Sequence, residues 1–337
     1  MGGPPYAPKT WALGGRPSKA VDIPITAVLL LLFIVGAVTH MTILQLNRKR
    51  GHKFLFNGVI FGFCMARTTT CVLRIASISR PNNIRLAIAA QIFVAAGVIL
   101  LWIVNLLWSQ RILRSTHPQL GWHMGLSLAF KFLYVLIALT LIIVITATVQ
   151  SFYTLRPDIR SIDRSLQLYG STCFAIISFL PIPILILSFA LPRKQQRLEK
   201  FGYGSHRTKC AVLFVGTILL CLGAAFRAGT SWKTPVPQTQ PLPSYFHKAC
   251  FYIFNFVVEI MVVYMYAAMR ADLRFWVPNG AKGPGSYATL GAITTSARET
   301  EMGIRQEPSS DSITVCAQEG QDLVNREKGD NGKKERK

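Results

Sequence analysis

Residues 24–46 read PITAVLLLLFIVGAVTHMTILQL, and this stretch contains no charged side chain. At 1.5 Å per residue, a helix of this length crosses the hydrocarbon core of a bilayer, which is about 30 Å thick. A core helix of a soluble protein would instead present a polar face at every turn. Residues 24–46 therefore predict a transmembrane helix.

Six further apolar stretches of similar length follow, and the seven together decide the fold class. The six lie at Phe54–Ile78, Leu86–Ser109, Gly125–Gln150, Leu168–Ala190, Cys210–Phe226 (the shortest) and Ala249–Met269. The first span, Pro24–Leu46, is too long for the apolar region of a cleavable signal peptide. We therefore expect an all-α, polytopic membrane protein with a seven-transmembrane-helix bundle. Its predicted parts are a short extracellular segment at 1–23, the transmembrane domain at 24–270 and a cytosolic, largely disordered tail at 271–337.

The net charge of +22 would suit a nucleic-acid-binding protein if it gathered in one patch. Residues 271–337 hold ten Lys/Arg and ten Asp/Glu, so the whole excess lies in residues 1–270, mostly in short loops. Such loops follow the positive-inside rule, and we expect no nucleic-acid partner. The side with loops 47–53 and 191–209 has fifteen Lys/Arg, and the other side has eleven. This difference predicts an external N-terminus and a cytosolic C-terminus, and we favour the plasma membrane over an internal one.

Polar side chains inside the spans mark the candidate functional site, because charge at mid-bilayer is costly and normally faces the bundle interior. The second span carries a stripe with helical spacing, made of Asn57, Cys64, Arg67, Cys71 and Arg74. The seventh span carries another, made of Tyr252, Asn255, Glu259 and Tyr266. Arg67 and Glu259 lie about 20 Å and about 16 Å from the cytosolic end. An ion pair between them is therefore predicted.

The candidate intramembrane polar site comprises Arg67, Arg74, Glu259, Asn255, Tyr252 and Asn57. Two interpretations of this site stay open. In the first, the ion pair only neutralises two buried charges and fixes helix packing. In the second, the same residues form a ligand or switch site.

Three other features of the spans receive structural interpretations. Lys131 lies about 10 Å from the predicted cytosolic face, within reach of snorkelling to the interface. Gly58 and Gly62 form a small-xxx-small pair that predicts close helix packing. Pro181 and Pro183 predict a kink in the fifth span.

The spans lack the residues that intramembrane enzymes and cofactor-binding proteins need. They contain one histidine, His40, and no aspartate, so a catalytic zinc site is not expected. The seventh span has no lysine that could bind retinal as a Schiff base. We therefore expect neither an enzyme nor a bound cofactor or metal.

The most distinctive motifs lie between the second and third spans. FGFCMAR at 61–67 is followed by Arg74, by Arg80-Pro81, by RLAIAAQIFVAAG at 85–97, and by Asn105 and Gln110-Arg111. A further motif, RADLRFWVPNG at 270–280, follows the last span. Over residues from about 25 to about 285, these motifs resemble a fungal family of seven-helix proteins of unknown function, loosely labelled class-C-like G-protein-coupled receptors. The resemblance implies a membrane location and seven helices, without a known activity.

We interpret the chain as a non-enzymatic, receptor-like protein of the lipid bilayer that senses a small or lipidic ligand. The alternative is a transporter or lipid-translocating protein similar to the fungal lipid-exporter family, in which Arg67 and Arg74 would bind an anionic headgroup. A cytosolic partner is expected at the loop Leu191–Lys209 and at the tail. The ten Ser and Thr residues at 286–314 have two interpretations: the favoured one is that they are only part of a solvated linker, and the other is that they are kinase sites whose phosphates dock the tail on that basic loop.

Overall fold

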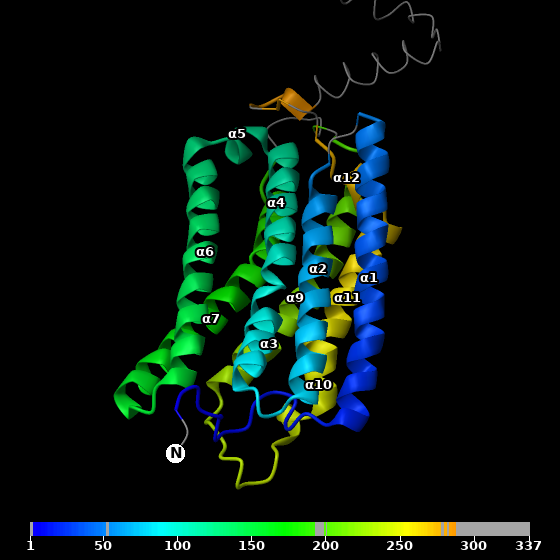
Figure 1. Ribbon diagram of the computed structural model, residues 1–337. Coiled ribbons are helices and arrows are strands. Elements are labelled where there is room, and N and C mark those ends of the chain that lie inside the picture. The colour runs from blue at the N-terminus through cyan, green and yellow to red at the C-terminus, as the bar shows by residue number, and fades with distance from the viewer. Residues whose placement is uncertain are drawn as a thin grey trace, which may run out of the picture. The chain divides into compact units, whose positions relative to one another are not determined.

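The computed structural model describes residues 3–51, 54–192, 199, 201–277, 280–281 and 283–287. Seven helical spans run side by side through it, which confirms the predicted all-α bundle (Figure 1). In chain order the spans are α1 (Lys19–Lys49), α2 (Phe56–Ser79), α3 (Ile84–Ala96) with α4 (Ile99–Thr116), α6 (Met124–Tyr153), α7 (Pro157–Phe179) with α8 (Pro181–Ala190), α9 (His206–Trp232), and α10 (Lys248–Tyr252) with the π-helical turn η2 (Ile253–Val257) and α11 (Val258–Ala268). Three short helices lie outside the spans, namely α5 (Pro118–Gly121), η1 (Ser244–Phe246) and α12 (Ala271–Arg274).

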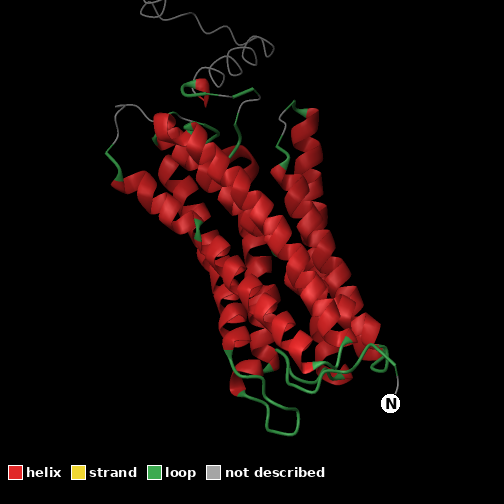
Figure 2. Ribbon diagram, turned by 90° about the vertical axis from the view of Figure 1, so that its left-hand side faces the viewer, coloured by secondary structure: helices red, strands yellow, loops and turns green. Residues whose placement is uncertain are grey.

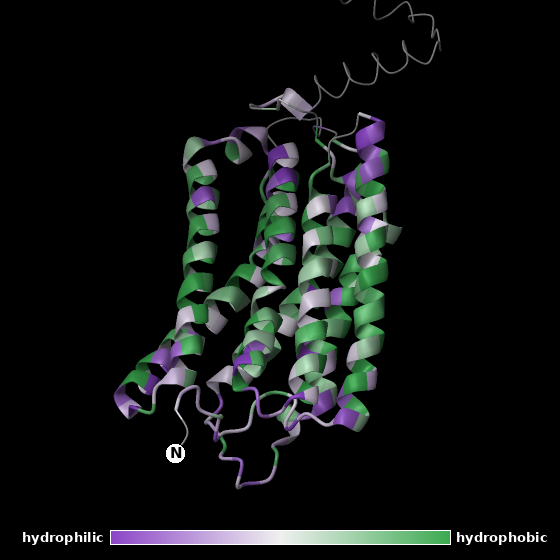
Figure 3. Cartoon of the chain, in the orientation of Figure 1, coloured by the Kyte–Doolittle hydropathy of each residue, from purple (hydrophilic) through white to green (hydrophobic). Residues whose placement is uncertain are grey.

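Hydrophobic residues predominate along the helices of the bundle (Figure 3), and many large ones are exposed on its outside. Leu31, Phe132 and Ile142 are each more than half exposed, at 62%, 67% and 61%. Apolar exposure on this scale would be unfavourable in water, but in a bilayer these side chains contact lipid. The chain is therefore a multi-pass integral membrane protein.

The two ends of the bundle carry different parts of the chain, and we name them by its termini. The N-terminal end holds residues 3–18 and the connections from α2 to α3, from α6 to α7 and from α9 to η1. The C-terminal end holds α5, α12 and the connections from α1 to α2 and from α8 to α9. Figure 2 shows the loops gathered at these ends, with helices between them.

Five of the seven spans are longer than hydropathy predicts, because helix continues through polar residues at their ends, and the difference is largest for the fifth and sixth. The fifth begins at Pro157, well before the predicted Leu168. The sixth continues past Phe226 to Trp232 and has 27 residues, so the expectation that it is the shortest was wrong; the seventh is shorter, with 21. The fifth span is interrupted between α7 and α8, as predicted, because Pro181 has no N–H to continue the helix.

A close helix approach lies at Gly223 of α9, and the expectation for Gly58 and Gly62 was wrong. A Cβ atom on Gly62 would have no heavy atom within 4 Å, and one on Gly58 would make only an ordinary contact of 3.5 Å with Leu44. A Cβ atom on Gly223 would lie 2.5 Å from the carbonyl oxygen of Phe254. The sixth and seventh spans therefore touch backbone to backbone at Gly223.

Two other expectations remain predictions. Lys131 is exposed on the outer surface of α6, but whether it snorkels depends on a membrane that the structure does not contain. Residues 288–337 of the tail and the loop residues Arg193, Lys194, Arg197 and Lys200 lie outside the described residues. The predicted tail disorder, the phosphorylation sites beyond Ser286 and the partner site on the basic loop are therefore not addressed by the structure.

Candidate functional site

The predicted ion pair between Arg67 and Glu259 is present at the centre of the bundle. The Nε atom of Arg67 donates to Oε2 of Glu259 at 2.6 Å, and Nη2 donates to Oε1 at 2.6 Å. Both side chains are buried, with 0% and 1% exposed. This bidentate geometry is the strongest that an arginine and a carboxylate can form.

A break in the third span supplies the other acceptors of Arg67. The helix is interrupted at Gly97 and Val98, between α3 and α4. Nη1 of Arg67 donates to the carbonyl oxygens of Phe93 at 3.3 Å and Val94 at 2.9 Å, in the last turn of α3. The carbonyls at a helix C-terminus carry partial negative charge and stabilise a cation. All three guanidinium nitrogens of Arg67 thus donate to acceptors within the bundle. The part of the predicted site around Arg67 is therefore occupied by the protein's own groups.

Arg74 and Tyr252 lie in a second cluster at the N-terminal end, built around Asp22. Nη2 of Arg74 lies 3.5 Å from Oδ1 of Asp22, and Nζ of Lys248 lies 2.5 Å from Oδ2. The Tyr252 hydroxyl donates to Oδ1 of Asp22 at 2.8 Å. Asp22 is fully buried. The expectation of spans without aspartate was wrong, because α1 begins at Lys19 and not at Pro24.

The two predicted amides, Asn57 and Asn255, join neither cluster. Asn57 is buried beside His40, nearer the C-terminal end. Asn255 donates from Nδ2 to the Phe251 carbonyl oxygen at 2.8 Å, within its own span. The six predicted residues are therefore distributed over the length of the bundle. A functional role for them as one site stays a prediction.

The seventh span forms side-chain hydrogen bonds with three other helices, at three depths in the bundle, through residues spaced seven apart. Tyr252 contacts Asp22 of α1, Glu259 contacts Arg67 of α2, and the Tyr266 hydroxyl donates to Oδ1 of Asn105 in α4. Positions seven apart lie on nearly the same face of a regular α-helix, as Glu259 and Tyr266 do in α11, whereas the π-helical turn η2 separates Tyr252 from them. The sequence analysis placed Tyr266 on the polar stripe, but it did not identify Asn105 as the partner.

Beyond the spans, Asp272 of α12 ties the C-terminal end together. Its Oδ2 accepts from Nδ2 of Asn47 at 2.8 Å and from Nη2 of Arg270 at 3.1 Å. Burial raises the pKa of this carboxyl, but the hydrogen bonds from Arg270 and Asn47 lower it more, so the pKa of Asp272 lies below its ordinary value. The carboxylate form is therefore favoured in the folded protein.

This lowered pKa predicts how Asp272→Asn depends on pH. A carboxyl with a lowered folded pKa stabilises the protein above its unfolded pKa of about 3.9, and the stabilisation is lost as the pH falls through the folded value. We expect the variant to lose about 1.5–3 kcal/mol of unfolding free energy at neutral pH. Thermal unfolding in detergent should show this deficit shrinking below about pH 4. A deficit that does not change with pH would contradict the assignment.

A cavity of 340 Å³ lies near the N-terminal end, between α3, α6, α7 and α9, apart from both ion-pair clusters. Its apolar walls include Ile92, Trp102, Leu141, Val144, Ile145 and Phe174. Its polar walls include Gln91, Thr148, Arg164, Gln167, Ser171 and Arg227. Small-ligand pockets usually have about 300–1,000 Å³ and combine apolar walls with a few polar groups. This cavity fits that description.

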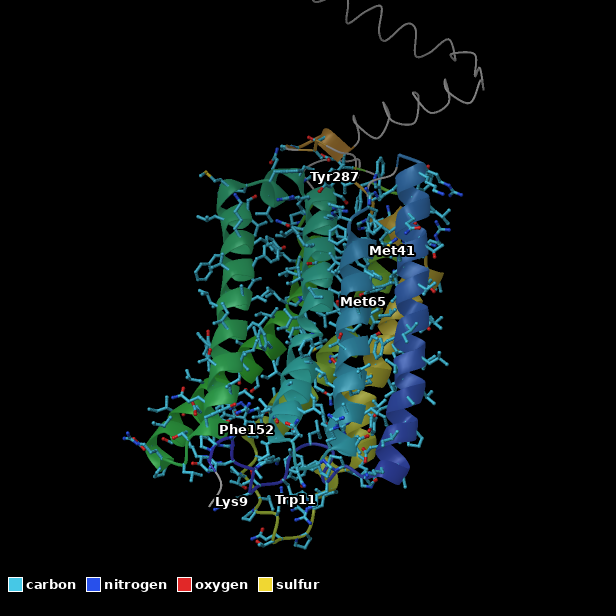
Figure 4. The ribbon with its side chains drawn as sticks, viewed as in Figure 1. Lys9, Trp11, Met41, Met65, Phe152 and Tyr287 are labelled. Atoms are coloured by element: carbon cyan, nitrogen blue, oxygen red, sulfur yellow. The ribbon has the colours of Figure 1, made fainter. Side chains whose placement is uncertain are left out.

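The N-terminal segment covers the cavity, with residues 10–13 in its lining. The amide of Trp11 donates to the carbonyl oxygen of Val236 at 2.9 Å, which ties the segment to the connection after α9. The amide of Tyr6 donates to the carbonyl oxygen of Phe152 at 2.8 Å. Figure 4 shows Trp11 and Phe152 at this end of the bundle and Tyr287 at the other. The segment is thus part of the cavity wall.

Comparison with known protein families gives a match over part of the chain. The family described as "Protein of unknown function (DUF3112)" is similar to residues 200–276, a minority of the chain. The matched residues include α9 and the seventh span, and with them Arg227, Glu259 and Tyr266. The chain matches no curated protein and no solved structure. The fungal origin and the receptor label that the motifs suggest are not supported by these comparisons.

Proposed function

We propose that this chain is a non-enzymatic, receptor-like membrane protein that binds a small ligand in the cavity between α3, α6, α7 and α9. The observation that carries this proposal is the cavity itself, which combines polar and apolar walls with a cover made by the N-terminal segment. The ion pair of Arg67 and Glu259 supports the packing interpretation of those residues, because its groups already have partners.

The transporter alternative is less well supported, because paired layers follow the cavity toward the C-terminal end. One layer is the ion pair of Arg67 and Glu259. The next joins Tyr266 to Asn105, whose Nδ2 donates to Thr217 of α9 at 3.3 Å. A substrate that followed the interior of the bundle along α2, α4 and the seventh span to the other end would separate both layers. A receptor needs only to transmit a change of packing through them.

Filling the cavity tests the proposal. Ser171 of α7 lines the cavity, and Ser171→Phe should occupy space that a ligand needs. Native mass spectrometry of the purified wild type should show a retained small molecule, and a thermal-shift screen should find stabilising ligands. Both signals should be lost in the variant. Ser165→Phe is the matched control, because Ser165 is exposed on the same helix outside the cavity. Equal ligand retention and stabilisation in wild type and Ser171→Phe would contradict the proposal.

We also propose that the N-terminal end faces the outside of the cell. This orientation rests on the excess of Lys and Arg at the C-terminal end. A reporter fused before Met1 should read external, and one fused after Lys337 should read cytosolic. The reversed pair of readings would overturn the orientation. Two readings on the same side would contradict an odd number of spans.

A further inference from the structure

We infer that the ligand is a small organic anion whose oxyanion head binds Arg227 and whose apolar body fills the rest of the cavity. This inference rests on the proposed function, because it names the ligand class of that cavity. Arg227 lies in α9, one residue beyond the predicted end of the sixth span, and it belongs to no site that the sequence analysis identified.

The guanidinium of Arg227 lacks an acceptor within the described part of the chain. Its Cζ atom lies 5.4 Å from the ring centroid of Trp102, which is a cation–π contact and provides no hydrogen-bond acceptor. Arginine carries five N–H donors and is charged at every physiological pH. Near the membrane interior, such a group normally finds a carboxylate or backbone carbonyl partner, as Arg67 does. Arg227 instead lines the cavity.

The charges around the cavity favour an anion. Two further cations line it, Arg164 and Lys233, and none of its described lining residues is acidic. Nη2 of Arg164 donates to the carbonyl oxygens of Ser231 and Lys233, which fixes it at the end of α9. The carboxylate of Glu259 is close enough to act on Arg227 electrostatically, but both its oxygens accept from Arg67. The positive charge of Arg227 is thus left for a ligand.

The rest of the cavity suits an apolar body of limited size. The rings of Trp102 and Phe174 pack with their centroids 5.6 Å apart, and Leu141, Val144 and Ile145 of α6 complete that wall. Its 340 Å³ is at the lower end of the range for small-ligand pockets, about 300–1,000 Å³. A carboxylate with a single short chain or one ring fits this volume better than a lipid with two chains.

The experiment uses the full chain in phosphatidylcholine nanodiscs, with decanoate and decanol as probes that differ in the head group. Decanoate should raise the melting temperature of the wild type, and decanol should not. Arg227→Gln should bind decanoate at least tenfold more weakly, which corresponds to about 1.4 kcal/mol. Arg156→Gln is the matched control, because Arg156 is 72% exposed and lies outside the cavity. A third arm replaces part of the phosphatidylcholine with phosphatidylglycerol. If this lipid raised the melting temperature of the wild type and not that of Arg227→Gln, the anion would be assigned to a membrane lipid.

A second readout does not depend on the probe. An unpaired cation in a partly buried place costs stability, so Arg227→Gln without ligand should melt at the same temperature as the wild type or higher. A lower melting temperature would show that Arg227 holds the fold together and would overturn the inference. The inference would also be overturned if decanoate and decanol bound equally well to the wild type and neither bound to Ser171→Phe. That result would leave the proposed function intact, because the cavity would still bind a ligand. Ligand binding that Ser171→Phe does not change would contradict the proposed function itself.

Discussion

Arg67→Met should leave the carboxylate of Glu259 buried without its partner and should destabilise the protein by about 3–5 kcal/mol. The variant also removes the donor to the carbonyl oxygens of Phe93 and Val94, so the break between α3 and α4 loses its cation. Chemical unfolding in detergent micelles measures the loss. Arg156→Met is the control, because the ion pair of Arg156 with Asp158 is exposed and should contribute little.

Two double variants sharpen this prediction. Exchanging the charges, with Arg67→Glu and Glu259→Arg, should not rescue stability, because a carboxylate at position 67 would face the carbonyl oxygens of the last turn of α3. Replacing both residues by methionine should recover part of the loss, since no unpaired charge remains. Full rescue by the charge exchange would contradict the role assigned to the α3 carbonyls.

Gly223→Ala should strongly destabilise the bundle. Its Cβ atom would lie 2.5 Å from the Phe254 carbonyl oxygen, a backbone atom that no side-chain rotation can move. Overpacking of this kind costs about 1–3 kcal/mol, and we expect a value at the upper end with reduced yield of folded protein. Size-exclusion chromatography and thermal unfolding in detergent measure both effects.

Gly62→Ala provides the matched comparison for Gly223→Ala. A Cβ atom at position 62 would meet no heavy atom within 4 Å. Alanine is the better helix former, so this variant should be neutral or more stable by up to about 1 kcal/mol. If Gly62→Ala proved as damaging as Gly223→Ala, the packing described for α9 and the seventh span would be wrong.

The sequence predicts the ion pair of Arg67 and Glu259 because each is the charged member of a polar stripe at similar depth. The spacing of seven from Tyr252 through Glu259 to Tyr266 also identifies the inward face of the seventh span. Such signals are local, because they depend only on helical periodicity and on the cost of charge in lipid.

Three charged residues near the N-terminal end could not be identified from helical periodicity and the cost of charge in lipid. Asp22, Arg227 and Lys248 lie within two residues of the predicted span boundaries, where a hydropathy criterion stops at the first charge. The structure shows that helix continues through Asp22 and Arg227 and begins at Lys248. The cavity could not be predicted either, because its lining residues come from four spans, the N-terminal segment and the connection after α9, which are far apart in sequence.

The central claim is our proposal that the cavity binds a ligand, which in a receptor would enter from the N-terminal end. The direct test places Ser171→Cys in a background without the seven native cysteines and labels it in sealed vesicles with a membrane-impermeant maleimide. Our account predicts labelling from the side of the N-terminus, with protection by a bound ligand, and none from the other side. Labelling from the side of the C-terminus at a comparable rate would contradict the account, because the layers formed by Arg67 and Tyr266 would then open as they do in a transporter.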